Sequence, residues 1–167
     1  MTNKLTSINT DEALKIAMQC AMDMKNFYKK ASELIEDNDD AYAILSGLSE
    51  KHADHKAKLF KGYSSALGKK LLYLKLGRKH KLKTLQTCGD DPNDAVRMAK
   101  KNETELKKYY VIVSRRVYEP EIRLLFRELA TEIDQHLALL ESSFAEPLTL
   151  DEESIAEERF EKEYSTN

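Results

Sequence analysis

Glycine and proline are scarce in this chain, with 5 glycines and 3 prolines among 167 residues. Because these two residues mark most turns, their scarcity indicates a mostly helical chain with few connections. Cys20 and Cys88 are the only thiols, and they form no CxxC pair. The sequence therefore supports neither a disulfide framework nor a structural metal site built on cysteine pairs. We expect Cys20 in the core and Cys88 exposed in a polar loop.

A strong net charge and long apolar runs are also missing. The chain has 27 Lys and Arg residues against 29 Asp and Glu residues, a formal net charge of −2. This balance gives no overall field that would attract nucleic acid or an anionic membrane. No stretch approaches the roughly 20 apolar residues that span a bilayer, and MTNKLTSINTDE lacks the apolar core of a signal peptide. We therefore expect a cytoplasmic protein without a membrane partner.

Four amphipathic helices follow from the hydrophobic pattern, and the length suits one domain. Asn9 with Glu12 three residues later is a helix-start signal, and a proline follows both Asp91 and Glu119. Short linkers make the helices of each pair antiparallel, so the predicted fold is an all-α antiparallel four-helix bundle. The predicted helices cover residues 9–35, 41–67, 93–117 and 121–144.

Two segments interrupt this pattern. Residues 68–91, between the second and third helices, have the length of a long crossover, so we assign 1–147 to the bundle. Residues 148–167 form an acidic C-terminal helix or tail. The lysines of residues 69–83 alternate with leucines, which is typical of an amphipathic segment with its lysines outward, and we expect His80 to be exposed there. Without a recognition motif, these lysines do not predict a nucleic-acid partner.

The two halves of the chain repeat one pattern. Tyr28 in the first helix matches Tyr110 in the third, 82 residues later, and His55 in the second matches His136 in the fourth, 81 residues later. Two copies of one helical hairpin, joined by a long crossover, build a four-helix bundle.

These helices resemble the ferritin-like proteins, and among them the rubrerythrin-like helical domain, here without a rubredoxin domain. The matching stretches are EALKIAMQCAMDMKNFYKKASE with LSEKHADHKAKL, and DAVRMAKKNETELKKYY with LATEIDQHLALLE. In that family each half supplies a Glu seven residues before a Tyr, then a Glu-x-x-His motif. The resemblance implies a ferritin-like bundle whose core holds two irons between four carboxylates and two histidines.

This chain departs from the family pattern at three of the four carboxylate positions. Ala21 stands at the Glu position of the first helix, His52 at the Glu of the first Glu-x-x-His motif, and Ile133 at the Glu of the second. Glu103, seven residues before Tyr110, is the carboxylate that remains. The resemblance therefore predicts a degenerate di-iron site.

The loss of three carboxylates argues against a pair of irons. Two divalent ions carry a charge of about +4, and Glu103 alone leaves most of it uncompensated in a low-dielectric core. Bridging oxygens hold paired metals about 3.5–4 Å apart, and both bridging glutamates are replaced, by His52 and Ile133. Ordinary rubrerythrin peroxidase or ferroxidase activity is not expected, and we assign no catalytic residue.

The polar residues that remain form a different candidate site. His52, His55, Glu103 and His136 would converge from three helices and offer three imidazoles and one carboxylate. This set predicts a single divalent transition metal, with Zn²⁺, Fe²⁺ and Mn²⁺ all suited to it. Cu²⁺ is favoured less, because the methionines nearby have the spacing of residues that fill core gaps.

A second interpretation has no metal. Ala21 and Ile133 would then fill the former metal cavity, and the histidines would be hydrogen-bonded core residues. Replacing buried charges by well-packed apolar residues can stabilise a bundle, so this arrangement is physically sound. The protein would be a non-catalytic helical scaffold or a partner-binding protein.

Three further residues lie near the candidate site. Tyr28 and Tyr110 are placed beside the ligands by the resemblance, and a buried tyrosine hydroxyl needs a partner. Ordinary core packing explains their spacing equally well. Glu132 lies about one turn from His136, and we expect it on the solvated face. For the whole protein we expect a homo-oligomer, with a dimer favoured.

Overall fold

The structure is a computed structural model that describes residues 7–68, 76–146 and 148. Over these residues the chain is helical, with no strand, and each long helix starts and ends within two residues of its predicted bounds. The predicted all-α four-helix fold is therefore confirmed. The elements are α1 (Thr10–Leu34), α2 (Asp39–Leu67), the short 3₁₀ helix η2 (Arg78–His80), α3 (Pro92–Arg116) and α4 (Pro120–Ser143).

Side chains at the helix ends explain these boundaries. The carboxamide oxygen of Asn9 accepts a hydrogen bond from the backbone N–H of Glu12 at 3.0 Å, which satisfies one free donor of α1. Asn38 caps α2 and Asp91 caps α3 in the same way. At the other end of α2, Gly68 adopts a left-handed backbone with φ of 60°, which glycine enters without steric cost.

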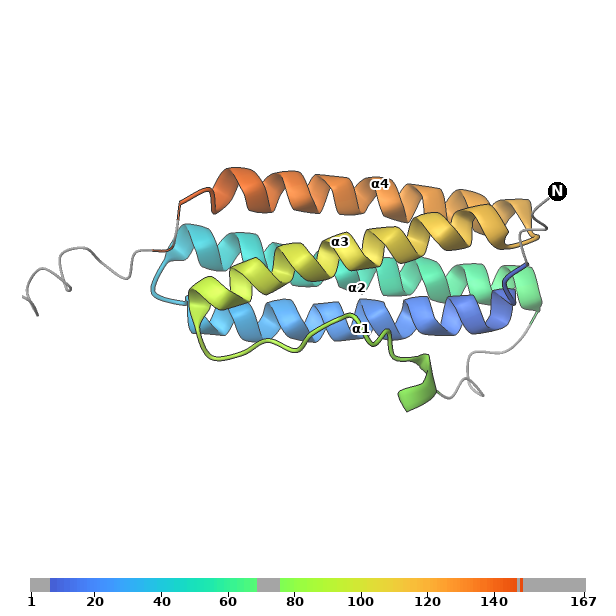
Figure 1. Cartoon of the computed structure of the whole chain (residues 1–167), viewed down its shortest axis with the longest axis horizontal. Coiled ribbons are helices and arrows are strands. Elements are labelled where there is room, and N and C mark those ends of the chain that lie inside the picture. The colour runs from blue at the N-terminus through green and yellow to red at the C-terminus, as the bar shows by residue number, and fades with distance from the viewer. Residues whose placement is uncertain (1–6, 69–75, 147, 149–167) are drawn as a thin grey trace, which may run out of the picture.

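The bundle consists of two antiparallel hairpins, α1 with α2 and α3 with α4 (Figure 1). The hairpins pack against each other through α1 with α3 and α2 with α4, and these pairs are antiparallel as well. The crossover therefore has to carry the chain from one end of the bundle back to the other. Its described part, residues 76–91, runs along α1 to the start of α3 (Figure 1).

The crossover is packed more tightly than the sequence indicates. His80 is 1% exposed and Cys88 is 7% exposed, so the prediction that they are exposed is wrong. Nδ1 of His80 accepts a hydrogen bond from the backbone N–H of Gly77 at 3.1 Å. The carboxamide of Asn102 in α3 exchanges two hydrogen bonds of 2.9 Å with the backbone of Gln86. The Asn102–Gln86 bonds hold the crossover against α3, and Nζ of Lys30 in α1 donates a further hydrogen bond of 2.9 Å to the backbone C=O of Cys88.

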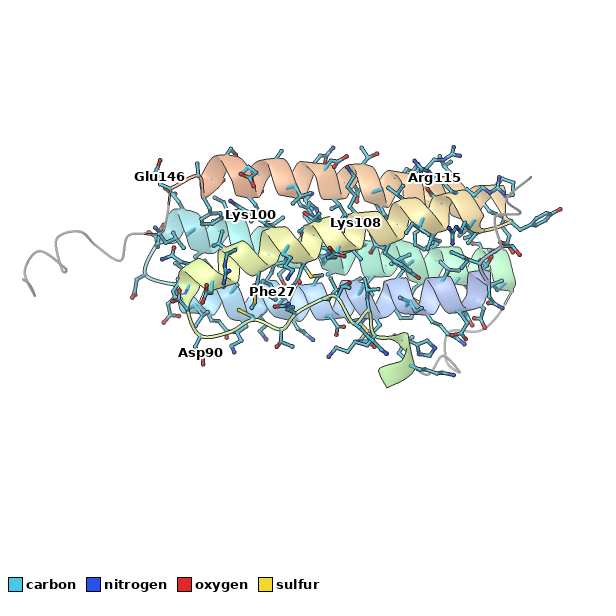
Figure 2. The ribbon with its side chains drawn as sticks, viewed as in Figure 1. Phe27, Asp90, Lys100, Lys108, Arg115 and Glu146 are labelled. Atoms are coloured by element: carbon cyan, nitrogen blue, oxygen red, sulfur yellow. The ribbon has the colours of Figure 1, made fainter. Side chains whose placement is uncertain are left out.

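Apolar side chains from all four helices fill the interior. Leu14 and Phe126 are fully buried, and each such side chain contributes roughly 1.5–3 kcal/mol to folding. Cys20 is fully buried among them, as predicted. Charged residues such as Asp90 and Lys108 lie on the outside (Figure 2). Among the described helices, none combines the length and apolar character needed to cross a membrane.

The C-terminal segment is described only at its start. The backbone N–H and C=O of Leu148 form hydrogen bonds of 2.7 and 3.1 Å with the carboxamide of Asn93, at the start of α3. The remainder of the predicted acidic helix or tail, residues 149–167, lies outside the described residues.

Candidate metal centre

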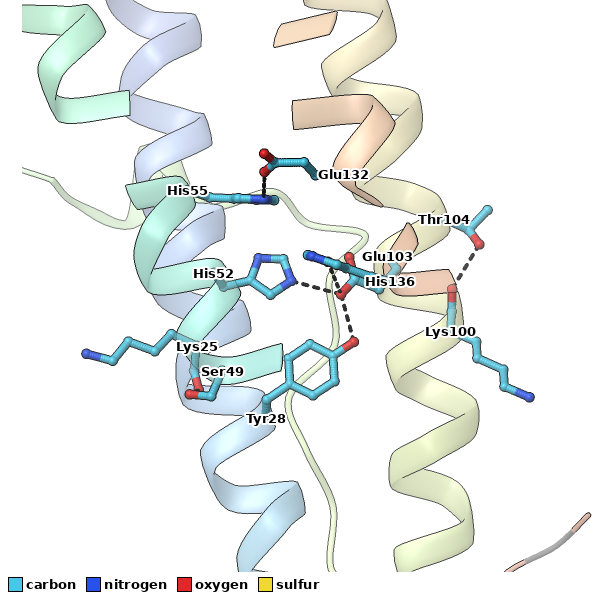
Figure 3. Close-up of polar contacts among 10 residues, drawn as sticks. All are labelled: Lys25, Tyr28, Ser49, His52, His55, Lys100, Glu103, Thr104, Glu132 and His136. Carbon is cyan, nitrogen blue, oxygen red and sulfur yellow. Dashed lines mark hydrogen bonds and ion pairs between the residues drawn. The ribbon is translucent and has the colours of Figure 1, made fainter. Parts of the chain in front are cut away.

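Three polar side chains from three helices meet in the middle of the bundle. His52 of α2 and Glu103 of α3 are 0% exposed, and His136 of α4 is 5% exposed. Each offers one ligand atom, and these three atoms all lie within 4.8 Å of one another. Nε2 of His52 is 2.8 Å and Nδ1 of His136 is 3.3 Å from Oε1 of Glu103 (Figure 3). The convergence predicted for these three residues is present.

The helical repeat explains why these side chains point inward. His52 follows the buried Leu48 by four residues, and His136 precedes the buried Leu140 by four. Residues four apart share a helix face, so each histidine lies on an apolar stripe that packs into the core. Glu103 occupies the same kind of position on α3. The site is therefore a polar cluster enclosed by the packing of the bundle.

Tyr28 of α1 adds a fourth helix to the cluster. Its hydroxyl donates a hydrogen bond of 2.7 Å to Oε1 of Glu103, and its ring stacks on His52 with 5.6 Å between centroids (Figure 3). Burial, and then the charge of Glu103, raise the pKa of Tyr28, so its hydroxyl stays protonated. Tyr110, its counterpart in the repeat, is equally buried, but its hydroxyl has no hydrogen-bond partner among the described residues. The two tyrosines therefore differ in hydrogen bonding: the hydroxyl of Tyr28 binds Glu103, and that of Tyr110 is unpaired among the described residues.

Glu103 is ionised in this environment. Burial alone would raise the pKa of its carboxyl group, but the charges and hydrogen bonds of His52 and His136 outweigh burial and hold the pKa far below its ordinary value. An ionised carboxylate only accepts hydrogen bonds, so Nε2 of His52 acts as a donor when no cation is bound, whereas Nδ1 of His136 lies near Oε1 without the alignment of a regular hydrogen bond. Oε2 of Glu103, also buried, has no hydrogen-bond partner among the described residues. Oε1 thus accepts hydrogen bonds from Tyr28 and His52, while Oε2 is left unsatisfied.

His55 lies beside the cluster but faces another carboxylate. Its ring stacks on that of His136, with 5.3 Å between centroids, while its Nε2 lies 2.6 Å from Oε2 of Glu132, without the alignment of a regular hydrogen bond. Burial, followed by the charges of His52 and His136, lowers the pKa of His55, although Glu132 opposes the shift. His55 is therefore neutral, and the structure does not place it with the other three predicted ligands.

Glu132 makes more contacts with neighbouring side chains than its position in the sequence indicates. Its side chain is 31% exposed and contacts His55 (Figure 3). It also forms an ion pair of 2.7 Å with Lys58. The sequence predicts Glu132 on the solvated face, and it is partly exposed there, but α2 and α4 pack closely enough for it to reach across to His55. Its spacing of one turn from His136 was the available signal.

A di-iron centre does not fit these residues. Ala21 and Ile133, at two of the family's carboxylate positions, are 0% exposed and belong to the apolar core. Glu103 is the only carboxylate in the buried cluster of the described chain. A single carboxylate balances only one of the about four positive charges that two divalent ions carry, and it leaves paired ions without the further bridging oxygens that they need.

Comparisons with known proteins support the fold and leave the function open. No protein-family model matches the chain, and no curated protein matches it. A solved structure of a hypothetical protein from Pyrococcus furiosus is similar, with a TM-score of 0.67 and 24% sequence identity. The match covers 83% of this chain and 89% of that one. At this identity the similarity shows a shared fold alone.

Proposed function

We propose that this chain is a ferritin-like protein with an altered metal site, which binds one divalent transition metal through His52, Glu103 and His136. The observation that supports the proposal is the arrangement of their ligand atoms, which come from three helices, are buried, and lie within 4.8 Å of one another. A cation at this position would also satisfy Oε2 of Glu103 or replace the donors around Oε1.

The ligand set narrows the choice of metal. Two imidazoles and one carboxylate suit Zn²⁺, Fe²⁺ and Mn²⁺, and the cluster contains no sulfur ligand that would favour copper. Three protein ligands also leave a coordination position free, as in catalytic rather than structural zinc sites. His55 would become a fourth ligand only if its ring turned away from Glu132. We propose no reaction for the site.

One observation favours a second candidate, a metal-free scaffold. Oε1 of Glu103 already has three potential donors within 3.3 Å, from Tyr28, His52 and His136. Charge-assisted hydrogen bonds of this kind stabilise a buried carboxylate without a cation. In this case the cluster would hold the four helices in register.

Metal analysis of protein purified without an affinity tag separates the two candidates. We expect one equivalent of metal per chain, retained on gel filtration and lost in the His52→Ala, His136→Ala double variant. His80→Ala is the matched control, because His80 is also buried but lies on the crossover away from the cluster. Metal-free protein that takes up no Zn²⁺, Fe²⁺ or Mn²⁺ would support the scaffold.

Thermal unfolding gives an independent measurement. A ligand at 100 times its Kd stabilises the folded state by about 2.7 kcal/mol, which in a chain of this size raises Tm by roughly 5–11 °C. We expect this shift with added Zn²⁺ in the wild-type protein and in the His80→Ala control. A Tm that ignores all three metals would overturn the metal proposal.

A further inference from the structure

A groove of about 630 Å³ opens between α2 and α4. Ligand-binding pockets in proteins range over about 300–1,000 Å³, so a small organic molecule would fit. His136 and Glu132 line it from α4, and Lys51 and Lys58 are among the residues that line it from α2. Because His136 also belongs to the buried cluster, the groove reaches the outer side of the candidate metal centre at this residue.

The two ends of the groove differ in polarity. Ile44, Gly47 and Leu48 of α2 line the first part of it along that helix, and they are followed by the polar side chains from Lys51 onward. The helices are antiparallel and Glu132 contacts His55, so Leu139 of α4 lies toward the apolar end. The groove therefore has an apolar end and a polar end, and the polar end contains His136.

The charges at the polar end favour an anion once a metal is bound. Lys58 is paired with Glu132 at 2.7 Å, and Lys51 and Asp54 have opposite charges, so these side chains nearly cancel. A divalent ion held by Glu103 leaves about one positive charge in a buried site, where an anion is strongly attracted. The free coordination position gives this anion a place to bind.

We propose that the groove between α2 and α4 binds an aliphatic monocarboxylate, with its carboxylate at the His136 end and its alkyl chain along Ile44, Gly47, Leu48 and Leu139. This inference rests on the proposed function, because the bound metal supplies the charge that selects an anion. The apolar end supplies the affinity for the alkyl chain, since burying apolar surface is favourable and not directional.

Titration of straight-chain carboxylates into the zinc-loaded protein tests the proposal. Acetate, butanoate, hexanoate and octanoate differ in methylene groups, and each methylene that becomes buried should tighten binding about fourfold. We expect this progression by isothermal titration calorimetry. We also expect octanoate to bind metal-free protein at least about tenfold more weakly, because the metal's charge is then missing.

A variant that fills the apolar end sharpens the test. A Cβ atom built at Gly47 meets nothing within 4 Å, and Gly47 lines the groove, so we expect the indole of Gly47→Trp to occupy the apolar end. We expect it to weaken octanoate binding about tenfold or more while zinc affinity is unchanged. Leu124→Trp is the matched control, since Leu124 is 55% exposed on α4 and does not line the groove.

The outcomes separate this inference from the proposed function. If the protein binds zinc but carboxylate affinity does not increase with the length of the alkyl chain, the inference is overturned and the metal site stands. The same holds if Gly47→Trp leaves octanoate affinity unchanged. Equal octanoate affinity with and without zinc overturns it as well. Failure to bind zinc overturns both. If Gly47→Trp instead shifts self-association in sedimentation and octanoate does not bind, a second copy of the chain covers the groove and the proposal is wrong.

Discussion

The hydroxyl of Tyr28 donates a hydrogen bond to Oε1 of Glu103, with 2.7 Å between the oxygens and both residues 0% exposed. This bond joins α1 to α3 across the centre of the bundle. It also orients the carboxylate toward His52 and His136, whose nitrogens face the same oxygen. Tyr28 is therefore a positioning residue for the candidate site.

Removing this hydroxyl should destabilise the metal-free protein. A hydrogen bond to a charged group contributes about 1.5–3 kcal/mol, so we expect Tyr28→Phe to lower the free energy of unfolding by that amount. Tyr110→Phe is the matched control, because its buried hydroxyl lacks a hydrogen-bond partner among the described residues and its loss should be neutral or stabilising. Urea unfolding measures both. Equal destabilisation of the two variants would contradict the assigned role of Tyr28.

The carboxylate of Glu103 should matter more for metal binding than that of Glu132. Glu103→Gln keeps the shape but removes the negative charge that balances the ion, and we expect zinc affinity to fall more than about 100-fold. Glu132 lies outside the three-residue cluster, so Glu132→Gln should change zinc affinity less than about fivefold. Competition with a zinc-sensitive chromophore measures both affinities. A larger loss with Glu132→Gln would place the metal beside His55 instead.

The stability of the metal-free protein should depend on pH through His55. Its pKa is lowered in the folded state, so the unfolded chain binds more protons below the ordinary histidine pKa of 6.5. The contribution of neutral His55 to the free energy of unfolding is fully present above this pH. It is lost as pH falls toward the folded-state pKa, by up to about 1.4 kcal/mol per pH unit. We expect chemical unfolding with a chelator present to show a smaller pH dependence between pH 7 and 5 in His55→Gln.

Protonation of Glu103 also makes the folded protein less stable as pH falls, but it does so at lower pH. Its pKa is held below the ordinary value of 4.5, so its stabilisation is lost only as pH falls below that value. Between pH 6.5 and 4.5 the loss of stability therefore comes from His55 and not from Glu103. An unchanged pH profile in His55→Gln above pH 5 would show that His55 is not held neutral in the folded protein.

Two glycines in α2 provide a test of the packing. Gly47→Ala should stabilise the protein by about 0.5–1 kcal/mol, because alanine favours the helix and the new Cβ meets nothing within 4 Å. At Gly62 the new Cβ would lie 2.8 Å from Cδ2 of Leu125, so that side chain must move. We expect Gly62→Ala to gain less, or to destabilise. Thermal unfolding compares them, and a larger gain at Gly62 would contradict the close approach of α2 and α4.

The regular elements of the fold were predictable from local chemistry. Asn9 caps α1, and Pro92 and Pro120 begin α3 and α4, because caps and helix-start prolines act within a few residues of the chain. The crossover was not predictable in this way. His80 and Cys88 are buried by contacts with distant parts of the chain. The segment that contains them has no periodic hydrophobic pattern from which these contacts could be predicted.

The candidate site was also predictable in part: the convergence of three residues was expected, but the orientation of His55 was not. His52, Glu103 and His136 converge because each lies on an apolar helix stripe, and the resemblance to the ferritin-like helices led us to expect this convergence. The orientation of His55 was not predictable, since it depends on which carboxylate its ring meets across the α2–α4 contact. The ring meets Glu132, whose spacing of one turn from His136 indicates its helix face, while the reach of Glu132 to His55 follows from the packing of α2 against α4.

A crystal structure of the zinc-loaded protein, with anomalous scattering measured at the zinc edge, tests the central claim most directly. The single-ion site predicts one anomalous peak per chain, about 2.0–2.2 Å from ligand atoms of His52, Glu103 and His136. Two peaks about 3.5–4 Å apart in the core, or no peak among these three residues at saturating zinc, would contradict it.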